Sequence, residues 1–478
     1  MRDPQSLLTS LRVLLGERHV VAQAVDLEPL TRDWRGRYQG TALCAVYPAD
    51  TEQVAAIVLL VREHGGKIVP QGGNTGMCGG ATPFSDNTVV LRLDRLNRVR
   101  QVSPLDNTMT VEAGCILADL QARAQEAGRL FPLSLGAEGS CQIGGNIATN
   151  AGGTAVLRYG PMRDMVLGLE VVLPDGSVMN DLKRLRKDNS GYAVRHLFIG
   201  AEGTLGIITA AVLKLFPQPQ TNATAMAGAG HLDQALELLA SVRSRFGDRV
   251  SAYEVMSHSQ MQLVLDHIPG CTLPFAEPHP WYVLIEAEDS FAAMDLAAIL
   301  EECLADALER GLVADAVIPR SGAQREALWR LRHSVSEANK VAGISVSYDT
   351  VVPLDRLGDF AAETERGVRA AFPQARLLFV GHVGDGNLHA VIHFDHDAFP
   401  SRAAFETAAE RINEIVDSAT LACDGSISAE HGIGLSNRKR LARSIDPARY
   451  RLMTQIKALL DPDHMMNPGK VLVFEDPQ

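Results

Sequence analysis

Residues 135–153 place the strongest constraint on how this chain can fold. The segment reads LGAEGSCQIGGNIATNAGG, contains six glycines and has the periodicity of neither a helix nor a strand. It lies between segments with the pattern of core strands and it contains isoleucines, which distinguishes it from a flexible linker. Because a long ordered loop inside a compact domain is usually functional, we expect this segment to surround a ligand.

A second glycine-rich loop, residues 70–80, directly follows a strand expected at residues 67–69. Five of its eleven residues, PQGGNTGMCGG, are glycine, which lets backbone N–H groups approach an anion such as a pyrophosphate. The loop lacks the lysine of a P-loop and the G-x-G-x-x-G spacing of a dinucleotide Rossmann site. Alone, it is explained equally well as a tight structural turn. Together, the two loops suit a long ligand with a phosphate end and a flat end.

The remaining sequence alternates helical and strand patterns over 478 residues, a length that suggests two or three domains. Asp50 and Gln53 are placed to cap a helix that ends at Gly65, and residues 174–176 form the turn of a hairpin. Pro217 marks a predicted boundary between the first and the second half of the chain. The second half predicts an α+β layer with helices on one face of an antiparallel sheet.

The net charge of −12 argues against a general affinity for nucleic acid or anionic membranes. No run of about 18 apolar residues occurs, so we expect no transmembrane segment, and the N-terminus has the pattern of an amphipathic helix rather than a signal peptide. We therefore expect the protein in the cytoplasm, or peripherally at the inner face of a membrane. The seven scattered cysteines include no C-x-x-C pair, which argues against a disulfide framework and an iron–sulfur cluster.

Two histidines, His382 and His389, stand at the ends of the short loop GHVGDGNLH between two apolar runs. This is either a polar turn that carries histidines or half of a metal site. Another segment, AEHG, supplies Glu430 and His431. Two imidazoles and one carboxylate suit a divalent ion such as zinc. From the spacing alone, buried core histidines remain the better explanation.

These motifs together resemble the FAD-binding domain of vanillyl-alcohol oxidase type flavoproteins, and most closely the FAD-linked D-2-hydroxyacid dehydrogenases. PQGGNTG is similar to the family's pyrophosphate loop, residues 135–153 to its second FAD loop, and GAEGTLGIIT, residues 200–209, to the strand that closes around the adenine side. GHVGDGNLH, SISAEHGIG and the terminal NPGK extend the resemblance over essentially the whole chain.

The resemblance implies an α+β fold. A vanillyl-alcohol oxidase (PCMH-type) FAD-binding domain is expected at residues 1–217, with its core at about 38–217. An α+β cap domain with an antiparallel sheet, which would hold substrate and metal, is expected at 218–435. Residues 436–478 would return to the FAD domain.

FAD is the cofactor that the resemblance implies. Some family members attach FAD through a histidine in or near the first loop, but residues 70–80 contain none, so we expect non-covalent binding. The residues expected to contact FAD are Pro70, Gln71, Gly72, Gly73, Asn74, Thr75, Gly76 and Met77 in the first loop; Pro132, Leu135, Gly136, Gly139, Ser140, Gly144, Gly145, Asn146, Thr149, Asn150, Gly152 and Gly153 in the second; Glu202, Gly206, Ile207 and Ile208 around the closing strand; and Asn467 near the C-terminus.

The same resemblance implies roles for the polar residues of the second half. His382, His389 and Glu430 would bind a divalent metal, expected to be zinc, and His431 would lie beside the flavin. Oxidation of a 2-hydroxy acid moves a hydride to flavin N5 and needs a base, which His431 would supply. The substrate-binding residues would be Arg332, which is placed to bind the substrate carboxylate, and Ser336, which stands where related enzymes carry a threonine.

Two departures from the family pattern bear on the substrate. Enzymes of the hydroxyglutarate type carry a lysine and an asparagine where this chain has Ser347 and Val391. Without that cation and amide, a distal carboxylate would be held poorly. We therefore predict a D-2-hydroxy acid with a short or apolar side chain, such as D-lactate, with D-2-hydroxyglutarate as the alternative.

The electron acceptor is expected to be a separate quinone, cytochrome or flavoprotein, because the metal and short-acid pattern favours a dehydrogenase over an oxidase that uses O₂. The protein could form a homodimer. A different class of function is a zinc-dependent hydrolase, in which His382, His389 and Glu430 would activate water. That alternative predicts a colourless protein, whereas a flavoprotein is yellow.

Overall fold

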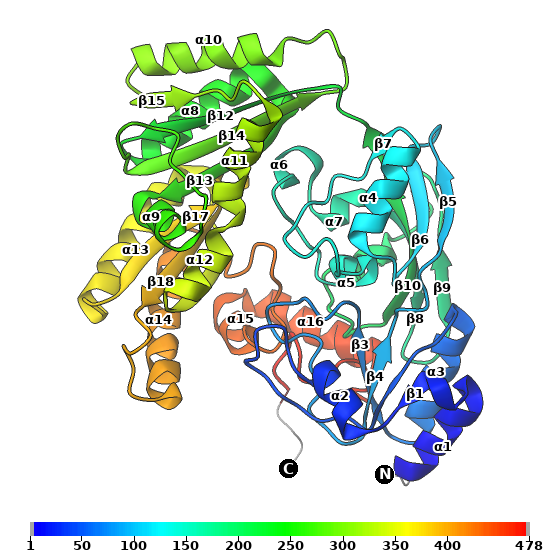
Figure 1. The fold of residues 1–478 in the computed structure, drawn as a ribbon. Helices are drawn as coiled ribbons and strands as arrows, with labels where there is room; N and C mark the ends of the chain where they lie inside the picture. Colours follow the sequence, from blue (N-terminus) through cyan, green and yellow to red (C-terminus); the bar gives the residue numbers. More distant parts are fainter. Residues whose placement is uncertain (1–3, 475–478) are drawn as a thin grey trace. The chain divides into compact units, whose positions relative to one another are not determined.

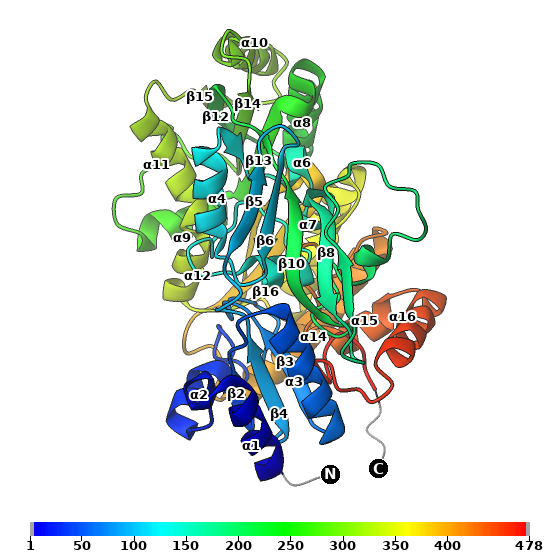
Figure 2. The same cartoon turned by 90° about the vertical axis from the view of Figure 1, so that its right-hand side faces the viewer.

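Each of the two structural units of this protein contains segments that lie far apart in the sequence. The structure, a computed structural model, describes residues 4–474. Unit 1 comprises the described residues up to 152, residues 160–218 and those from 430 onward, and unit 2 comprises residues 153–159 and 219–429. Figures 1 and 2 show the elements of both units from two directions.

Unit 1 contains two main sheets over a shared hydrophobic core. In the four-stranded sheet, of order β1-β2-β4-β3, strands β2, β4 and β3 are parallel and β1 is antiparallel to β2. The five-stranded sheet, of order β5-β6-β10-β8-β9, is antiparallel throughout. Both sheets contribute to one core, for example through Ile68 and Val89 of the first and Val111 and Val171 of the second.

The strands of unit 1 are β1 (Val20–Val21), β2 (Cys44–Val46), β3 (Lys67–Gln71), β4 (Thr88–Arg92), β5 (Val99–Ser103), β6 (Thr108–Glu112), β7 (Arg129–Leu130), β8 (Val166–Val172), β9 (Val178–Asp181), β10 (Ile207–Lys214) and β11 (Phe216–Pro217). Its helices are α1 (Pro4–Leu15), α2 (Ala24–Thr31), α3 (Thr51–Glu63), α4 (Leu117–Glu126), α5 (Ile143–Ala148), α7 (Met162–Met165), α15 (Arg438–Ser444) and α16 (Pro447–Leu460), with short 3₁₀ turns at Glu17–His19 and Val194–Leu197.

Local signals act in unit 1 as the sequence predicts. The Asp50 side chain accepts a hydrogen bond from Gln53 N at 2.8 Å, and Ala49 N donates to the Gln53 side chain, which closes the predicted cap of α3. The β8–β9 hairpin turns at residues 173–177, where Gly176 has φ +82°. Strand β3 runs two residues beyond the prediction, so that Pro70 and Gln71 belong to the strand.

Unit 2 is built on a seven-stranded antiparallel sheet of order β15-β12-β14-β13-β17-β18-β16 (Figure 1). Its strands are β12 (Thr221–Ala229), β13 (Val250–Ser257), β14 (Trp281–Asp289), β15 (Asp315–Val317), β16 (Ile344–Val351), β17 (Arg376–Gly381) and β18 (Asn387–Phe394). Its helices are α6 (Val156–Tyr159), α8 (Leu232–Phe246), α9 (His258–His267), α10 (Leu296–Glu309), α11 (Gly322–His333), α12 (Val335–Ala342), α13 (Leu357–Ala371) and α14 (Arg402–Ala422).

Helices cover both faces of this sheet, so the expectation that they lie on one face was wrong. One hydrophobic cluster joins one face to α8, α10, α13 and α14, and a second joins the opposite face to α9, α11 and α12. The central strands are apolar at consecutive positions: in β14, Val283 and Ile285 belong to the first cluster and Tyr282 and Leu284 to the second. A strand that is apolar on both sides must be covered on both sides.

The C-terminal segment joins unit 1 through β3. Ile68 N donates to Met465 O at 2.9 Å, and Asn467 N donates to Ile68 O at 2.7 Å. These bonds add the chain around Met466 as a parallel bridge beside Ile68. Asn467, a predicted cofactor residue, is thereby held beside the first glycine-rich loop.

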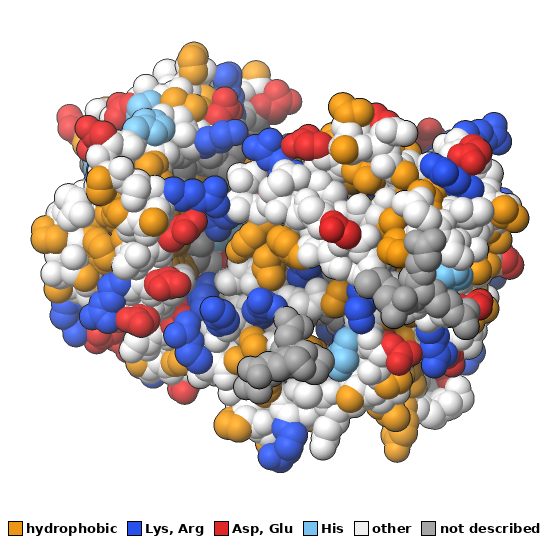
Figure 3. All heavy atoms as spheres, turned by 90° about the horizontal axis from the view of Figure 1, so that it is seen from below, with side chains coloured by type: hydrophobic (Ala, Val, Ile, Leu, Met, Phe, Trp, Pro, Cys, Tyr) orange, Lys and Arg blue, Asp and Glu red, His pale blue; other side chains and the backbone are white. Residues whose placement is uncertain are grey.

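None of the helices formed by residues 4–474 combines the length and the hydropathy needed to span a bilayer. Figure 3 shows acidic and basic side chains interspersed over one face of the molecule, so the net charge of −12 is not gathered into one patch on that face.

Candidate functional site

The two glycine-rich loops meet within unit 1. At Gly73, an added Cβ would overlap the carbonyl oxygen of Ser140, and at Gly72 it would lie 3.3 Å from Gln142 Cβ. Loop 70–80 therefore approaches the second loop through bare backbone. This contact joins the end of β3 in one sheet to the segment that leads into α5.

Helix α5 is a short helix that the sequence did not predict within the second loop. Gly144 lies where an added Cβ would be 2.7 Å from Ala113 Cβ, and Gly144 N donates to Ala113 O at 2.7 Å. Gly144, one of the two glycines that hide the helical periodicity, is thus the residue that allows α5 to lie against the chain that follows β6. At Gly145, in contrast, an added Cβ would meet no atom within 4 Å.

The third predicted segment, residues 200–208, lies against the first two. Glu202 N donates to Ala148 O at 2.8 Å, and Gly200 N donates to Ile147 O at 3.1 Å. An added Cβ at Gly203 would lie 2.9 Å from Pro70 Cγ. Unit 1 therefore brings the predicted cofactor segments together, although they are separated by long stretches of sequence.

Glu202 has a structural role within this cluster. Its two carboxylate oxygens accept hydrogen bonds from Ile433 N at 2.7 Å and Gly434 N at 2.8 Å, and its carbonyl oxygen accepts one from Asn467 Nδ2 at 2.7 Å. Burial raises the pKa of Glu202 to about 7. The side chain thus ties residues 433 and 434 to the third predicted segment.

Several other predicted residues also make contacts within the protein. Gln71 Nε2 donates to Leu30 O and Ala81 O, both at 2.9 Å, and Asn150 Oδ1 accepts from Arg163 N at 2.9 Å. Gly153 falls in unit 2, apart from the rest of the second loop. The predicted non-glycine residues with a positive φ are Asn74, Asn150, Glu202 and Asn467.

Three buried side-chain oxygens in this region lack a hydrogen-bond partner among the described residues: Gln142 Oε1, Asn146 Oδ1 and Asn467 Oδ1. Buried polar atoms in native proteins are normally paired, so these acceptors fit a ligand that brings hydroxyl or amine donors. FAD has such donors on its ribityl chain, ribose and adenine. The close backbone approach and the unpaired acceptors are both consistent with FAD bound along these loops.

Replacing Gly73 by alanine is expected to lower the affinity for FAD at least about tenfold, which corresponds to about 1.4 kcal/mol. The new Cβ would push the first loop away from Ser140 O. The measurement is FAD titration of the apoprotein, followed by flavin fluorescence. Gly322→Ala is the control, since an added Cβ there meets no atom within 4 Å and Gly322 is not among the residues expected to contact FAD. Equal affinity in both variants would show that this close approach does not shape the FAD site.

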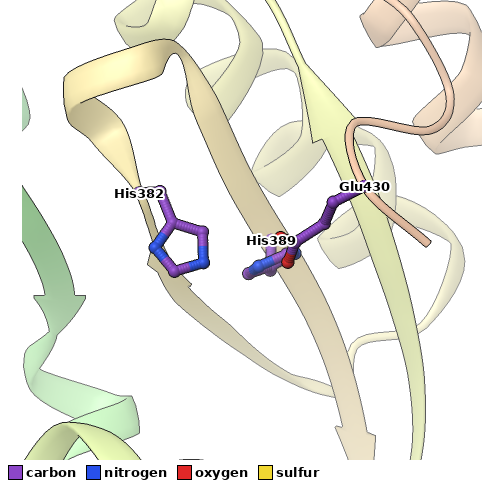
Figure 4. Close-up of side chains that lie close together, drawn as sticks. All are labelled: His382, His389 and Glu430. Atoms are coloured by element: carbon purple, nitrogen blue, oxygen red, sulfur yellow. The ribbon is translucent and has the colours of Figure 1, made fainter. Parts of the chain in front are cut away.

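The two loop histidines lie at the turn of the β17–β18 hairpin in unit 2. His382 follows β17, His389 lies in β18, and Gly386 turns the chain with φ +86°. Their ring centroids are 5.8 Å apart and the ring planes are nearly perpendicular, at 82°. Figure 4 shows the Glu430 side chain beside both rings, and the potential ligand atoms of the three residues lie within 4.8 Å of one another.

The neighbouring backbone positions Glu430. It follows Ala429, whose N–H donates to Asp349 Oδ2 at 2.9 Å, and the Ser428 hydroxyl donates to the same oxygen at 3.1 Å. Asp349 lies opposite His389 in the β16–β18 pairing. One carboxylate of the sheet therefore holds the segment that presents Glu430 close to a predicted ligand.

Buried carboxylates stand behind both histidines. Glu254 Oε1 is 2.6 Å from His382 Nδ1, and Asp349 Oδ1 is 3.8 Å from His389 Nδ1. When Nδ1 faces a carboxylate, Nε2 of the ring is left for a metal, and such partners fix the tautomer and orientation of ligand histidines. The donor set and its supports therefore fit a divalent ion.

Arg332 is connected to this group through Glu254. Its Nε donates to Glu254 Oε2 at 2.7 Å, and only 13% of its side chain is exposed. Burial alone would raise the pKa of Glu254, but the neighbouring His382 and Arg332 outweigh it and hold that pKa below its usual value. Glu254 therefore joins a predicted metal ligand to the predicted carboxylate-binding arginine.

The two remaining predicted residues are Ser336 and His431. Ser336 is exposed in α12, beyond the break at Ser334 that separates this helix from α11. His431 Nε2 lies 3.8 Å from Glu430 Oε1, which places its ring next to a predicted ligand in the chain.

Sequence reasoning missed Glu254 and Asp349. Glu254 is an acid in β13, a strand in which every residue is buried, and Asp349 is one of three consecutive buried residues in β16. A charged residue inside an apolar strand is a recognisable signal, because acids are almost never fully buried without a partner.

Comparison with known proteins identifies relatives over nearly the whole chain. Residues 42–181 match the FAD binding domain, and residues 218–471 match the family described as FAD linked oxidases, C-terminal domain. D-2-hydroxyglutarate dehydrogenase, mitochondrial, of Bos taurus is 40% identical over 95% of this chain and 81% of the relative. D-2-hydroxyglutarate dehydrogenase of Xanthomonas citri pv. viticola is 37% identical over 100% of this chain and 98% of the relative. A putative mitochondrial D-lactate dehydrogenase of Schizosaccharomyces pombe is 35% identical over 93% and 84%.

Among solved structures, p-cresol methylhydroxylase with substrate bound superposes with a TM-score of 0.77. The alignment covers 98% of this chain and 96% of that structure at 18% identity, so it bears on the fold alone. Together with the FAD-binding match, it confirms the predicted α+β fold class and the PCMH-type FAD-binding domain.

Proposed function

The chain belongs to the family of FAD-linked oxidases, and on that premise we propose that it oxidises a D-2-hydroxy acid to the corresponding 2-oxo acid. The predicted resemblance is confirmed, and the protein is an FAD-dependent oxidoreductase. The observation that carries the proposal is the group of His382, His389 and Glu430, supported by buried carboxylates, in a chain with an FAD-binding domain.

Each of the proposed site residues has a separate role in the reaction. Bound FAD supplies the acceptor for the two electrons that leave the substrate Cα. We assign His431 the role of the base: one of its ring nitrogens would take the proton of the substrate hydroxyl. Arg332 offers the guanidinium that binds the substrate carboxylate, and Glu254, which accepts from its Nε, keeps that side chain in one orientation.

A divalent ion, proposed to be zinc, would be held by His382, His389 and Glu430. It would supply positive charge that lowers the pKa of the substrate hydroxyl and fixes the reacting face. For FAD, the absence of histidine from residues 70–80 supports non-covalent binding.

The two departures from the family pattern that bear on the substrate lie next to each other in the sheet of unit 2. Ser347 and Val391 lie directly opposite one another in the β16–β18 pairing. Asp349 and His389 form the next pair but one, so the side chains of both pairs are on the same face of the sheet. Val391 is 3% exposed and packs in a hydrophobic cluster. The side-chain end of a substrate bound at the histidines would meet an apolar group and a hydroxyl here, which supports a short or apolar side chain over a second carboxylate. The relatives carry both substrate names, so their names do not decide between the two acids.

Steady-state kinetics would separate D-lactate from D-2-hydroxyglutarate. We expect kcat/KM for D-lactate to be at least about tenfold higher, and the double variant Ser347→Lys, Val391→Asn to move that ratio at least about tenfold toward hydroxyglutarate. Ser345→Lys is the control, because Ser345 pairs with His393, one pair further from His389. A wild-type preference for hydroxyglutarate would overturn the proposed substrate while leaving the reaction class standing.

The other partners and the location remain predictions. We propose that electrons pass to a quinone, a cytochrome or another flavoprotein rather than to O₂. We also propose that the protein acts in the cytoplasm or peripherally at a membrane. A homodimer is a further prediction. The zinc hydrolase alternative loses its support, because residues 42–181 match an FAD-binding domain that a hydrolase would not need.

A further inference from the structure

A cavity of about 730 Å³ lies in unit 1, and the proposed reaction uses none of its lining residues. Val166 and Leu167 at the start of β8 and Lys214 at the end of β10 line it, together with the segment that follows β9, which arches out beside the sheet in Figure 2. This volume is typical of sites for small molecules. Lys214 lies at the opposite end of β10 from the predicted cofactor residue Ile207, about 23 Å along the strand.

The cavity is strongly basic in an acidic protein. Six lysine or arginine side chains line it against three aspartates, whereas the whole chain carries a net charge of −12. The cations are Arg163, Lys183, Arg186, Lys187, Arg195 and Lys214, and the aspartates are Asp164, Asp181 and Asp188.

The aspartates form ion pairs with only two of the six cations in the described structure. Lys183 lies 2.7 Å from Asp188 and 3.7 Å from Asp181, so one cation is paired with two of the three acids. Arg195 is 4.0 Å from Asp181. Within the part of the chain that the structure describes, no ion pair joins a carboxylate to the four other cations, Arg163, Arg186, Lys187 and Lys214.

Of the arginines that line the cavity, Arg163 is held by backbone carbonyls and Arg195 has a buried donor without a partner. Arg163 Nη1 donates to His196 O at 2.9 Å and its Nη2 donates to Ile199 O. Arg195 Nε is buried and has no hydrogen-bond partner among residues 4–474. Burial, followed by the neighbouring Arg195 and Arg163, holds the pKa of His196 below its usual value. An anion in the cavity would satisfy both the positive field and the unpaired donor.

We propose that this cavity binds a small organic polyanion that carries at least two phosphate or carboxylate groups. One group would meet Arg195 and Arg163, whose planar guanidinium groups suit the oxygens of either anion. A second would meet Arg186 and Lys187, which are exposed on the arch. Two groups are required because a single phosphate would fill little of 730 Å³. The proposal is independent of the substrate and of the reaction proposed above.

Isothermal titration calorimetry of the FAD-loaded enzyme with inorganic pyrophosphate and with citrate, at constant ionic strength, tests the proposal. We expect one site per chain with a Kd in the micromolar range for at least one probe, and the preferred probe distinguishes a phosphate ligand from a carboxylate ligand. Since either probe could also bind a metal at the histidine site, His389→Ala is titrated in parallel and should retain the affinity.

The variant Arg186→Gln, Lys187→Gln should bind the same probe at least about tenfold more weakly. Both side chains are exposed, so the fold should not depend on them. Arg184→Gln is the matched control, because Arg184 lies in the same segment but pairs with Asp106 at 3.1 Å and does not line the cavity. The proposal is overturned if neither probe gives a heat of binding. It is also overturned if the double variant binds the probe as tightly as the wild type, or if His389→Ala loses affinity for the probe.

Discussion

Replacing His389 by alanine should lower kcat by about a thousandfold while FAD remains bound. The substitution removes one of the three proposed metal ligands, the others being His382 and Glu430, and charge stabilisation by a bound metal is worth several kcal/mol. FAD should be retained, because the loops that approach one another around the predicted FAD site belong to unit 1 and His389 belongs to unit 2. The measurements are kcat with D-lactate, metal content by atomic emission, and the ratio of flavin to protein.

His396→Ala is the control for this variant. His396 follows β18, is exposed, and has Val341 O, at 3.2 Å, as its one hydrogen-bond partner among the described residues. It should keep its metal, its flavin and its kcat. If His389→Ala retained wild-type kcat with its metal lost, the metal would have no part in the reaction.

Replacing Glu254 by glutamine should weaken metal binding by about ten- to a hundredfold, the usual effect of removing a carboxylate behind a ligand histidine. Glutamine keeps the shape of the side chain but removes the charge that His382 Nδ1 and Arg332 Nε share. KM for the acid should rise as well, because Arg332 would lose the partner that orients it. The measurements are metal affinity by competition with a chelator, KM and kcat separately, and the melting temperature.

Glu286→Gln provides a closely matched comparison. Glu286 is also a buried acid in the same sheet, and its Oε2 accepts hydrogen bonds from Arg325 and from Trp329 Nε1, but no histidine stands beside it in the described structure. Both variants should lose thermal stability, because each removes the charge of a buried glutamate that is paired with a partly exposed arginine. Only Glu254→Gln should lose metal affinity. Equal metal affinity in the two variants would show that Glu254 has only a structural role, as the partner of Arg332 in an ion pair.

Local sequence was sufficient for the elements whose signals lie within a few residues of one another. The cap at Asp50 and the hairpin turn at residues 173–177 follow from capping and turn chemistry. Helix α5 escaped prediction because its two glycines mask the helical pattern, and one of them, Gly144, is required for the close approach to Ala113.

Pairings between distant segments could not be predicted. Glu254 precedes His382 by 128 residues, and only the order of strands in the sheet brings β13 beside β17. Likewise Ser347 and Val391 were identified separately as departures, whereas their position opposite one another depends on the register of β16 and β18. The resemblance supplied the candidate ligands, and the tertiary structure supplied the carboxylates that support them.

Anaerobic mixing of the purified enzyme with a D-2-hydroxy acid, with flavin absorbance as the readout, tests the central claim most directly. With metal bound, D-lactate should bleach the flavin rapidly and L-lactate should not, and removal of the metal by a chelator should slow bleaching until zinc is restored. A flavin that stays oxidised with every D-2-hydroxy acid, or that bleaches equally fast after the metal is removed, would contradict the account.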